Sequence, residues 1–458
     1  MRLRLTGAQH AELASHLFPS DRGEAVAIAL CGRRGLDTLM IHEIELVPYE
    51  LCDRSSGHVT WPPTLLESIL VKATRNEMAV LKIHSHPSGL PRFSGTDDQS
   101  DQRLFESVCG WIDGDWPHAS AVMLPDGSMF ARAVRPGGRF ETIEKIAVIG
   151  DDIRMWAPGG HEAVPEFARR HAQIFGAGTT RLLRTLSVGV VGCSGTGSPL
   201  VEQLARLGVG ELILVDPDNV EEKNLNRIVG ATRDDAEHHR PKVEVLRRSV
   251  DAMGLGATVN AFHSPLKAVQ AREALAACDV VFGCMDSLGG RSTLNRLARY
   301  YTLAYIDVGV KLEGDGHGDV GQVAGAVHYL RPDGVGLMQR GVFTSKALEA
   351  ESLRENDPEG YADRLKRGYI EGVPEHRPAV VSVNTYFASL AVIELLARLH
   401  AFRSDTNAAY AIQRVSLTNT LWTRDGDSGA SQQEQRMVGR GDTTPFLGMP
   451  GLDEVNKH

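Results

Sequence analysis

The order of apolar and polar positions predicts two successive α/β segments. In the first segment, short runs that are continuously apolar or alternate between apolar and polar residues have the length of strands. These runs lie at residues 23–32, 39–47, 79–85, 118–124, 129–134 and 145–150. Residues 62–75 (PPTLLESILVKATR) have the period of an amphipathic helix, with proline in its first turn. The pattern predicts an α/β domain over residues 1–156.

The second segment opens on a strand, a glycine-rich turn, a helix and another strand. Residues 186–198 (LSVGVVGCSGTGS) form an apolar run closed by glycines, and residues 198–208 carry leucine and valine on one helical face. Residues 211–218 (ELILVDPD) form a second apolar run that ends on carboxylates. This order is typical of the βαβ unit that binds mononucleotides.

Later runs extend this segment into a Rossmann-like domain over residues 186–425. Strand-like runs lie at residues 279–285, 301–314, 318–334 and 408–424, and an apolar-periodic helix covers residues 379–402. We assign residues 157–185 to a linker and a lead-in helix, and we expect residues 426–458 to form a flexible tail. The charged segment 343–378, interrupted by glycine and proline, has the composition of a mobile region.

Composition and charge narrow the class of protein. The 458 residues carry a formal net charge of −9 and no long basic run, so nucleic-acid binding has little support. We find no 18-residue apolar segment and no signal-peptide core, which predicts a cytoplasmic protein with no membrane contact. The six cysteines are scattered without a Cys-x-x-Cys pair, so neither a disulfide framework nor a zinc ribbon is indicated.

The glycine-rich turn has the features of a nucleotide-binding loop. Gly192 and Gly197 let the backbone approach a phosphate, and the helix that begins at Ser198 directs free N–H groups at an anion. Asp216 follows about 20 residues later, the usual distance for a carboxylate that binds ribose hydroxyls. Ser194 stands at the middle glycine of the dinucleotide pattern. On these residues alone, a dehydrogenase and a nucleotide-free Rossmann domain both stay open.

The sequence that surrounds and follows Asp216 changes this interpretation. Between residues 191 and 291 the chain contains VGCSGTGS, VDPDNVEEKNLNR, RPKVE and VVFGCMDSLGGR. This set resembles the ThiF/MoeB/HesA family, the adenylation domains of ubiquitin-activating enzymes. The resemblance implies a homodimer that uses ATP and Mg²⁺ rather than NAD. It also implies adenylation of the carboxylate at a protein's C-terminus.

The resemblance assigns roles to the polar residues of this domain. It implies that Asp216 binds the ribose with Asp218 in support, and that Lys242 stabilises charge on the α-phosphate. Asp286 would hold Mg²⁺, since displacement at phosphorus requires its charge to be neutralised. The alternatives are surface salt bridges or, for Asp218 and Asn224, simple turn formation. The implied ATP set is Gly192, Gly195, Gly197, Asp216, Asp218, Asn224, Arg227, Lys242, Asp286 and, reaching the nucleotide of the other subunit, Arg170.

A second cluster of chemistry lies in residues 84–97 (HSHPSGLPRFSGTD). His84 and His86 are two residues apart at a predicted strand end, so both imidazoles point to one side of the strand. Two histidines and the carboxylate of Asp97 make a catalytic zinc set that leaves the fourth position for water. The alternative is an incidental His-x-His with Asp97 at the start of a helix.

The wider pattern includes Glu24, then His-x-His-Pro, then Ser-x-x-Asp, with seven residues between His86 and Ser94. It resembles the JAMM (JAB/MPN) metalloprotease family, which removes or trims ubiquitin-like proteins. The resemblance implies that His84, His86 and Asp97 bind Zn²⁺. It further implies that Glu24 is the general base and that Ser94 stabilises the oxyanion. Zinc lowers the pKa of its water to roughly 7, so a neighbouring carboxylate can accept the proton.

Together the two resemblances predict a bifunctional enzyme of a bacterial ubiquitin-like pathway. The first domain would process or remove a ubiquitin-like protein, and the second would adenylate its C-terminal carboxylate. No cysteine follows Cys284, so we expect no enzyme-bound thioester and transfer to an external nucleophile, such as a conjugating-enzyme-like protein. Sulfur-carrier activation, with thiocarboxylate formation for cofactor or cysteine biosynthesis, is one alternative. A catalytically inactive binding scaffold is the other.

Overall fold

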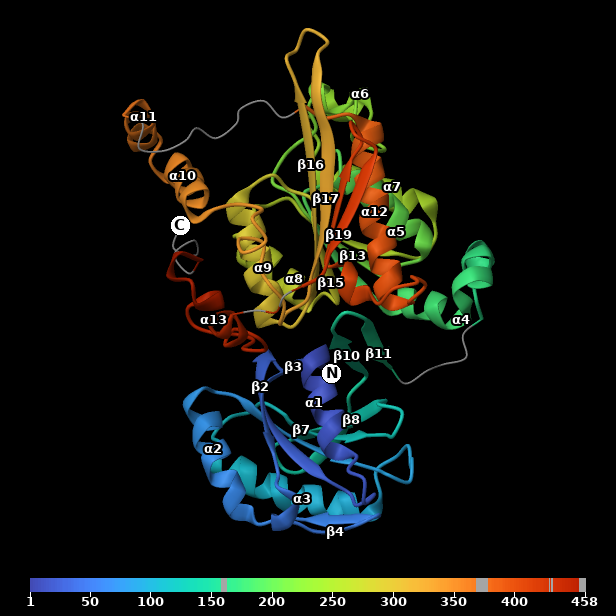
Figure 1. Cartoon of the computed structure of the whole chain (residues 1–458), viewed down its shortest axis with the longest axis vertical. Helices are drawn as coiled ribbons and strands as arrows, with labels where there is room; N and C mark the ends of the chain where they lie inside the picture. Colours follow the sequence, from blue (N-terminus) through green and yellow to red (C-terminus); the bar gives the residue numbers. More distant parts are fainter. Residues whose placement is uncertain (158–162, 368–377, 428, 430, 453–458) are drawn as a thin grey trace. The chain divides into compact units, whose positions relative to one another are not determined.

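The computed structural model describes residues 1–157, 163–367, 378–427, 429 and 431–452 and divides the chain into two compact units (Figure 1). Unit 1 comprises Met1–His161, Arg299–Thr302 and Gln432–Pro450. Unit 2 comprises Glu162–Ala298, Leu303–Ser431 and Gly451–His458. The linker expected at the start of 157–185 falls largely on residues 158–162, which lie outside the described residues.

Unit 1 is built on a mixed sheet with the strand order β11-β10-β1-β3-β2-β6-β7-β8-β9. Its strands are β1 (Arg2–Thr6), β2 (Val26–Arg34), β3 (Thr38–Leu46), β6 (Ala79–Ser85), β7 (His118–Met123), β8 (Met129–Arg135), β9 (Arg139–Thr142), β10 (Lys145–Ile149) and β11 (Ile153–Trp156), with a separate pair β4 (Asp53–Ser55) and β5 (His58–Thr60). Helix α1 (Gly7–Leu17) packs Leu13 on one face of the sheet. Helices α2 (Leu66–Arg75) and α3 (Gly95–Trp111) pack Ile69 and Phe105 on the other. Strand β6 is fixed between β2 and β7.

Part of the C-terminal segment belongs to unit 1, which differs from the flexible tail expected over residues 426–458. After α13 (Gln432–Gln435) the chain reaches β2 beyond the end of its pairing with β6, where Gly32 N–H donates to the Gly439 carbonyl (3.1 Å). A Cβ on Gly32 would lie 2.2 Å from that oxygen. Gly439 and Gly441 have φ of +68° and +66°, a region that favours glycine. These glycines permit the close approach of the two segments.

Unit 2 contains a sheet in the order β14-β13-β12-β15-β16-β17-β18-β19. Its strands are β12 (Ser187–Val191), β13 (Glu211–Val215), β14 (Thr258–Phe262), β15 (Val280–Gly283), β16 (Ala304–Gly314), β17 (Val320–Leu330), β18 (Ile412–Ser416) and β19 (Leu421–Asp425). The helices are α4 (Arg169–Thr185), α5 (Gly197–Leu207), α6 (Arg233–Glu237), α7 (Lys242–Met253), α8 (Val269–Ala277), α9 (Leu288–Tyr300), α10 (Ser345–Asn356), α11 (Pro358–Lys366) and α12 (Val381–Leu399). Strands β14, β13, β12, β15 and β16, in that order across the sheet, are parallel to one another. Strands β17, β18 and β19 extend the sheet in antiparallel fashion. The carboxyl ends of β12, β13 and β15 therefore meet at one edge, where such sheets bind ligands.

Two segments of unit 2 refine the sequence-based expectations. Within 343–378, helices α10 and α11 are present, and residues 368–377 lie outside the described residues. Helix α12 has a mean hydropathy of 1.2 over 18 residues and is long enough to cross a membrane by length and composition. The expectation that no such segment exists is therefore wrong. Within unit 2, 61% of that window is buried, and the helix packs against α5, β16 and β17, as a core helix does.

Candidate functional site

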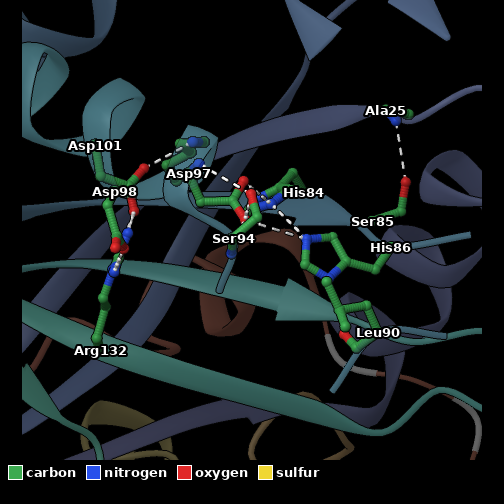
Figure 2. A network of polar contacts seen from close by, with 11 residues as sticks. Ala25, His84, Ser85, His86, Leu90, Ser94, Asp97, Asp98, Asp101 and Arg132 are labelled. Carbon is green, nitrogen blue, oxygen red and sulfur yellow. Dashed lines mark hydrogen bonds and ion pairs between the residues drawn. The ribbon is translucent and has the colours of Figure 1, made fainter. Parts of the chain in front are cut away.

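In unit 1, the end of β6 and the first turn of α3 bring His84, His86 and Asp97 together (Figure 2). His84 Nε2 lies 3.2 Å from His86 Nε2 and 3.0 Å from Asp97 Oδ1. His86 Nε2 lies 3.4 Å from Asp97 Oδ2. The ligand atoms of a tetrahedral zinc ion, with bonds of about 2.0–2.2 Å, are roughly 3.3–3.6 Å apart. The three side chains therefore fit a zinc ion with little adjustment.

Hydrogen bonds around this triad direct its metal-facing atoms. His86 Nδ1 lies 2.8 Å from the Leu90 carbonyl oxygen, so Nδ1 keeps its proton and Nε2 is the atom that would release a proton and bind a metal. Asp97 Oδ2 accepts from the backbone N–H of Ser94 (2.6 Å) and from its hydroxyl (2.7 Å). Ser94 is thus both the N-cap of α3 and a neighbour of the triad. This outer layer is the kind that orients ligands in metal sites.

Burial sets the protonation of the triad and of Glu24. It lowers the pKa of His84 to about 4, so the ring is neutral and able to act as a ligand. Burial opposes ionisation of Asp97, but hydrogen bonds from His84 and His86 lower its pKa below the ordinary value. Burial raises the pKa of Glu24 to about 7, against the opposing charge of His86. A carboxyl group with such a pKa is suited to general-base catalysis at neutral pH.

Hydrogen bonds of the backbone at Glu24 and Ala25 position Glu24 just before β2. Its N–H donates to the Ser55 carbonyl (2.7 Å). The next residue, Ala25, donates its N–H to Ser85 Oγ (3.0 Å) and accepts from Ser85 N–H (3.1 Å). Figure 2 shows Ala25 beside Ser85, which lies between the two histidines in sequence. These bonds therefore hold the preceding residue, Glu24, near the strand end that carries the histidines.

Behind the triad lies a buried charge network that sequence reasoning missed. Lys82, on the same strand face as His84, donates to Asp101 Oδ1 (2.7 Å). Arg132, on β8, donates to Asp101 Oδ2 through Nε (3.2 Å) and Nη2 (2.7 Å), and it also pairs with Asp98 (Figure 2). Burial alone would raise the pKa of Asp101, but the ammonium of Lys82 lowers it below its ordinary value. The network links β6, β8 and α3 beneath the triad.

Replacing Asp101 with Ala is expected to destabilise unit 1 by about 3–5 kcal/mol, because it leaves Lys82 buried without its carboxylate. Asp98→Ala is the matched control: it removes an exposed partner of the same Arg132 and should cost about 1 kcal/mol or less. Thermal unfolding of both variants measures the difference. The stability that ionised Asp101 contributes is fully present at pH values above the ordinary carboxyl pKa. It is lost as the pH falls through the lowered pKa of Asp101. Equal midpoints for the two variants would rule this role out.

In unit 2, the glycine turn between β12 and α5 is packed against backbone. Gly192 has φ of +92°, and a Cβ there would lie 2.6 Å from the Cys284 carbonyl oxygen. A Cβ on Gly197 would lie 1.8 Å from the Gly192 carbonyl oxygen. Both positions therefore require glycine, and the turn delivers the chain directly into the N-terminus of α5.

Asp216, Asp218 and Lys242 come together beside this turn. Asp216 Oδ2 accepts from Cys193 N–H (2.6 Å), and its Oδ1 accepts from Asp218 N–H (2.9 Å). Burial raises the pKa of Asp216, against the charge of Lys242. Lys242 Nζ, at the first residue of α7, lies 2.7 Å from Asp218 Oδ2 and 3.8 Å from Asp216 Oδ1. A buried ammonium thus stands next to the loop predicted to hold phosphates.

The other residues predicted to bind the nucleotide do not belong to the cluster of Asp216, Asp218 and Lys242. Arg227 borders the turn, since a Cβ on Gly195 would lie 3.1 Å from its Cδ, and its Nη1 donates to the Lys223 carbonyl (2.7 Å). Asn224 is buried, and its Oδ1 accepts from Glu221 N–H (3.0 Å), a turn-forming contact. Asp286 is exposed between β15 and α9. The cross-subunit role of Arg170, which is exposed on α4, stays a prediction.

Asn384, on α12, is a further residue at the glycine turn that sequence reasoning missed. Its Nδ2 donates to Thr196 Oγ1 (2.9 Å), and a Cβ on Gly195 would lie 3.3 Å from its Cγ. The side chain is buried, and its Oδ1 has no hydrogen-bond partner among the described residues. The two segments are 188 residues apart, so no local pattern could have indicated this contact.

Comparison with known proteins identifies relatives of both units. The model of the ThiF family matches residues 167–434, and that of the prokaryotic homologs of the JAB domain matches residues 8–134. The SAMP-activating enzyme E1 of Haloferax volcanii is 32% identical over 157 residues, covering 34% of this chain and 53% of the relative. The sulfur carrier protein ThiS adenylyltransferase of Escherichia coli is 32% identical over 106 residues, covering 23% and 41%.

The chain spans about half the length of the curated relatives it matches. Among solved structures, Escherichia coli MccB with ATP has a TM-score of 0.43 and 18% identity, covering 61% of this chain and 75% of that one. The ThiF match extends over more than half of the chain, and the two matched regions confirm the predicted α/β architecture. The chain therefore belongs to the ThiF family and carries a domain homologous to prokaryotic JAB domains before its ThiF domain.

Proposed function

We propose that this protein is a bifunctional enzyme acting on the C-terminal tail of a ubiquitin-like protein. Unit 2 adenylates the terminal carboxylate with ATP, and unit 1 cuts a peptide or isopeptide bond at such a tail with the aid of zinc. The observation that carries the proposal is the joint presence of two site arrangements in one chain. His84, His86 and Asp97 converge in unit 1, and Lys242 stands beside Asp216 and Asp218 next to the glycine turn in unit 2.

The chemistry of adenylation explains the residues of unit 2. A carboxylate oxygen attacks the α-phosphorus of ATP, an acyl–AMP bond forms, and the bond to the β-phosphate breaks to release pyrophosphate. Lys242 leaves Asp218 to neutralise charge that develops on the α-phosphate. Arg227 lies close enough to the glycine turn to contact the phosphates. Magnesium, held on the phosphates by Asp286, would neutralise further charge on the leaving pyrophosphate.

The chemistry of peptide hydrolysis explains the residues of unit 1. Zinc held by His84, His86 and Asp97 would supply Lewis acidity and lower the pKa of water. Glu24 accepts the proton of the attacking water and returns it to the leaving amine. Ser94 turns its hydroxyl from Asp97 toward the developing oxyanion and stabilises it by a hydrogen bond. Burial of this site strengthens each of these interactions.

Zinc binding is the simplest test of unit 1. We expect one zinc ion per chain by elemental analysis and a rise in the thermal midpoint, since about 2.7 kcal/mol is gained when free zinc is 100 times its Kd. His84→Ala should lose both the ion and the thermal shift. His58→Ala, which changes an exposed histidine of β5, should lose neither. Wild-type stability that does not respond to zinc would count against the metal site.

Trapping the substrate tests the proposed function as a whole. Glu24→Ala protein with ATP should retain a small protein whose C-terminus carries AMP, as seen by intact-mass spectrometry. The double variant Glu24→Ala/Lys242→Ala should retain it without AMP. An AMP adduct of equal yield in both would exclude the proposed adenylation site.

Sulfur-carrier activation is a second candidate, favoured by the similarity to the ThiS adenylyltransferase. Cys193 and Cys284, the two cysteines at the glycine turn, both have pKa values raised by burial, which suits neither to a thioester. The adenylate would then pass to an external nucleophile in both candidates. A thiocarboxylate on the released tail identifies sulfur transfer, and an isopeptide bond identifies conjugation.

A further inference from the structure

A hollow of about 500 Å³ in unit 1 adjoins the candidate metal site through Phe93 and Phe130. Its apolar lining comes from β8, β9, β10, β11 and the loop before α3. The principal apolar residues are Phe93, Phe130, Phe140, Ile143, Ile146 and Trp156. Such a concave, mainly apolar surface with four aromatic side chains is typical of a site that takes an apolar group.

The wall of this hollow is continuous with the catalytic residues. Phe93 directly precedes Ser94, and its ring centroid lies 5.1 Å from that of Phe130. The Phe130 ring in turn lies edge-on to the His86 ring at 6.2 Å. The apolar wall therefore reaches the histidine predicted to hold the metal, whose place beside Ser94 is seen in Figure 2.

Arg132 makes this wall rigid. Its guanidinium lies 3.9 Å from the Phe93 ring centroid and 3.8 Å from that of Phe140. The same group is held by Asp101 beneath it. A cation stacked between two rings and bonded to a buried carboxylate fixes both rings in place. The hollow is thus preformed rather than dependent on an incoming ligand.

A second, smaller hollow of about 300 Å³ is lined in part by residues next in sequence to Glu24 and His86. It is lined by Phe18, Pro19, Arg22, Gly23, Pro87 and Pro125. Gly23 precedes Glu24, and Pro87 follows His86. Because Glu24 must return its proton to the leaving amine, the amine side of the substrate lies toward this hollow. The carbonyl side lies toward the larger hollow, because Phe93 in its lining directly precedes Ser94, the residue proposed to stabilise the oxyanion.

We propose that the larger hollow is a specificity pocket for a bulky apolar side chain on the carbonyl side of the bond that unit 1 cuts. This inference rests on the proposed peptidase function and narrows its substrate class. A tail that ends in glycine leaves the pocket empty, whereas leucine or phenylalanine buries its side chain against the aromatic wall. We expect a preference of about 10–100-fold for Leu or Phe over Gly, the range that hydrophobic pockets achieve.

The test uses the full-length zinc-loaded protein and fluorescent peptides that differ only at the residue bearing the scissile carbonyl: Gly, Ala, Leu or Phe. Values of kcat/KM are measured for wild type, and fluorescence anisotropy measures binding of the same peptides to Glu24→Gln protein. Thr142→Trp covers the pocket from its exposed rim and should reduce the preference at least 10-fold in both assays. Thr64→Trp, which adds the same side chain at an exposed threonine outside both hollows, is the matched control and should leave the preference unchanged.

Binding that favours glycine, or a preference for Leu and Phe that Thr142→Trp leaves intact, overturns the pocket assignment. The binding assay does not require cleavage, so it separates this inference from the function on which it rests. An apolar preference in binding to Glu24→Gln protein, with no peptide cut by wild type, supports the pocket and counts against the peptidase.

Discussion

Replacing Glu24 with Gln is expected to reduce peptide cleavage by unit 1 about 10²–10⁴-fold, because the amide cannot accept the proton of the attacking water. Glutamine keeps the shape of the side chain and its N–H bond to Ser55, so zinc content and thermal stability should stay near wild type. The matched control is Glu45→Gln, which changes an exposed carboxylate on β3. Cleavage within threefold of wild type in the Glu24 variant would remove this residue from the mechanism.

The same residue predicts the pH dependence of cleavage. Burial raises the pKa of Glu24 to about 7, and its active form is the deprotonated one. Cleavage should therefore rise with pH through this pKa, with a midpoint at or below about 7, because a neighbouring zinc ion favours the carboxylate. A profile of kcat/KM from pH 5 to 9 measures it. A rate that falls over the same range would contradict the role of a general base.

Replacing Lys242 with Ala is expected to lower ATP–pyrophosphate exchange by unit 2 about 10²–10³-fold, the effect of removing one group that stabilises developing charge. The ammonium is buried beside Asp216 and Asp218, so its removal takes away the cation that contacts both carboxylates. Arg247→Ala removes an exposed cation from the same helix, α7, and serves as the control. Lys242→Arg keeps the charge and should recover part of the exchange.

Thermal unfolding of the Lys242→Ala protein accompanies this assay. A folded variant with full exchange would show that Lys242 only balances the two carboxylates. If Lys242→Ala loses both exchange and folding, the Lys242→Arg variant separates the two causes. Arginine restores the cation without restoring the geometry of the ammonium.

The sequence could predict those parts of the fold that are encoded locally. The strand predicted at residues 79–85 matches β6, and the spacing of His84 and His86 places both rings on one side of its end. The glycines at 192–197 predicted a turn, and in the structure this turn lies against the backbone carbonyl groups of Cys284 and Gly192. In each case the physical determinant, a strand period or the absence of a Cβ, lies within a few residues.

Contacts between distant segments could not be predicted in this way. The ion pair of Lys82 with Asp101 and the contact of Asn384 with Thr196 join elements that only the folded sheet brings together. The contact of Gly32 with Gly439 depends on a strand end that β6 leaves uncovered. From the sequence alone, the ion-pair residues look like surface charges and Asn384 looks like an ordinary helix residue. Gly32 and Gly439 look like turn glycines.

The measurement that tests the central claim most directly is ATP–pyrophosphate exchange by the 458-residue protein with the small protein trapped by the Glu24→Ala variant. The account predicts exchange that requires the free C-terminal carboxylate of that protein and that disappears in Asp286→Ala and Lys242→Ala. Exchange that persists when the carboxylate is amidated, or that is unchanged in both variants, would contradict it.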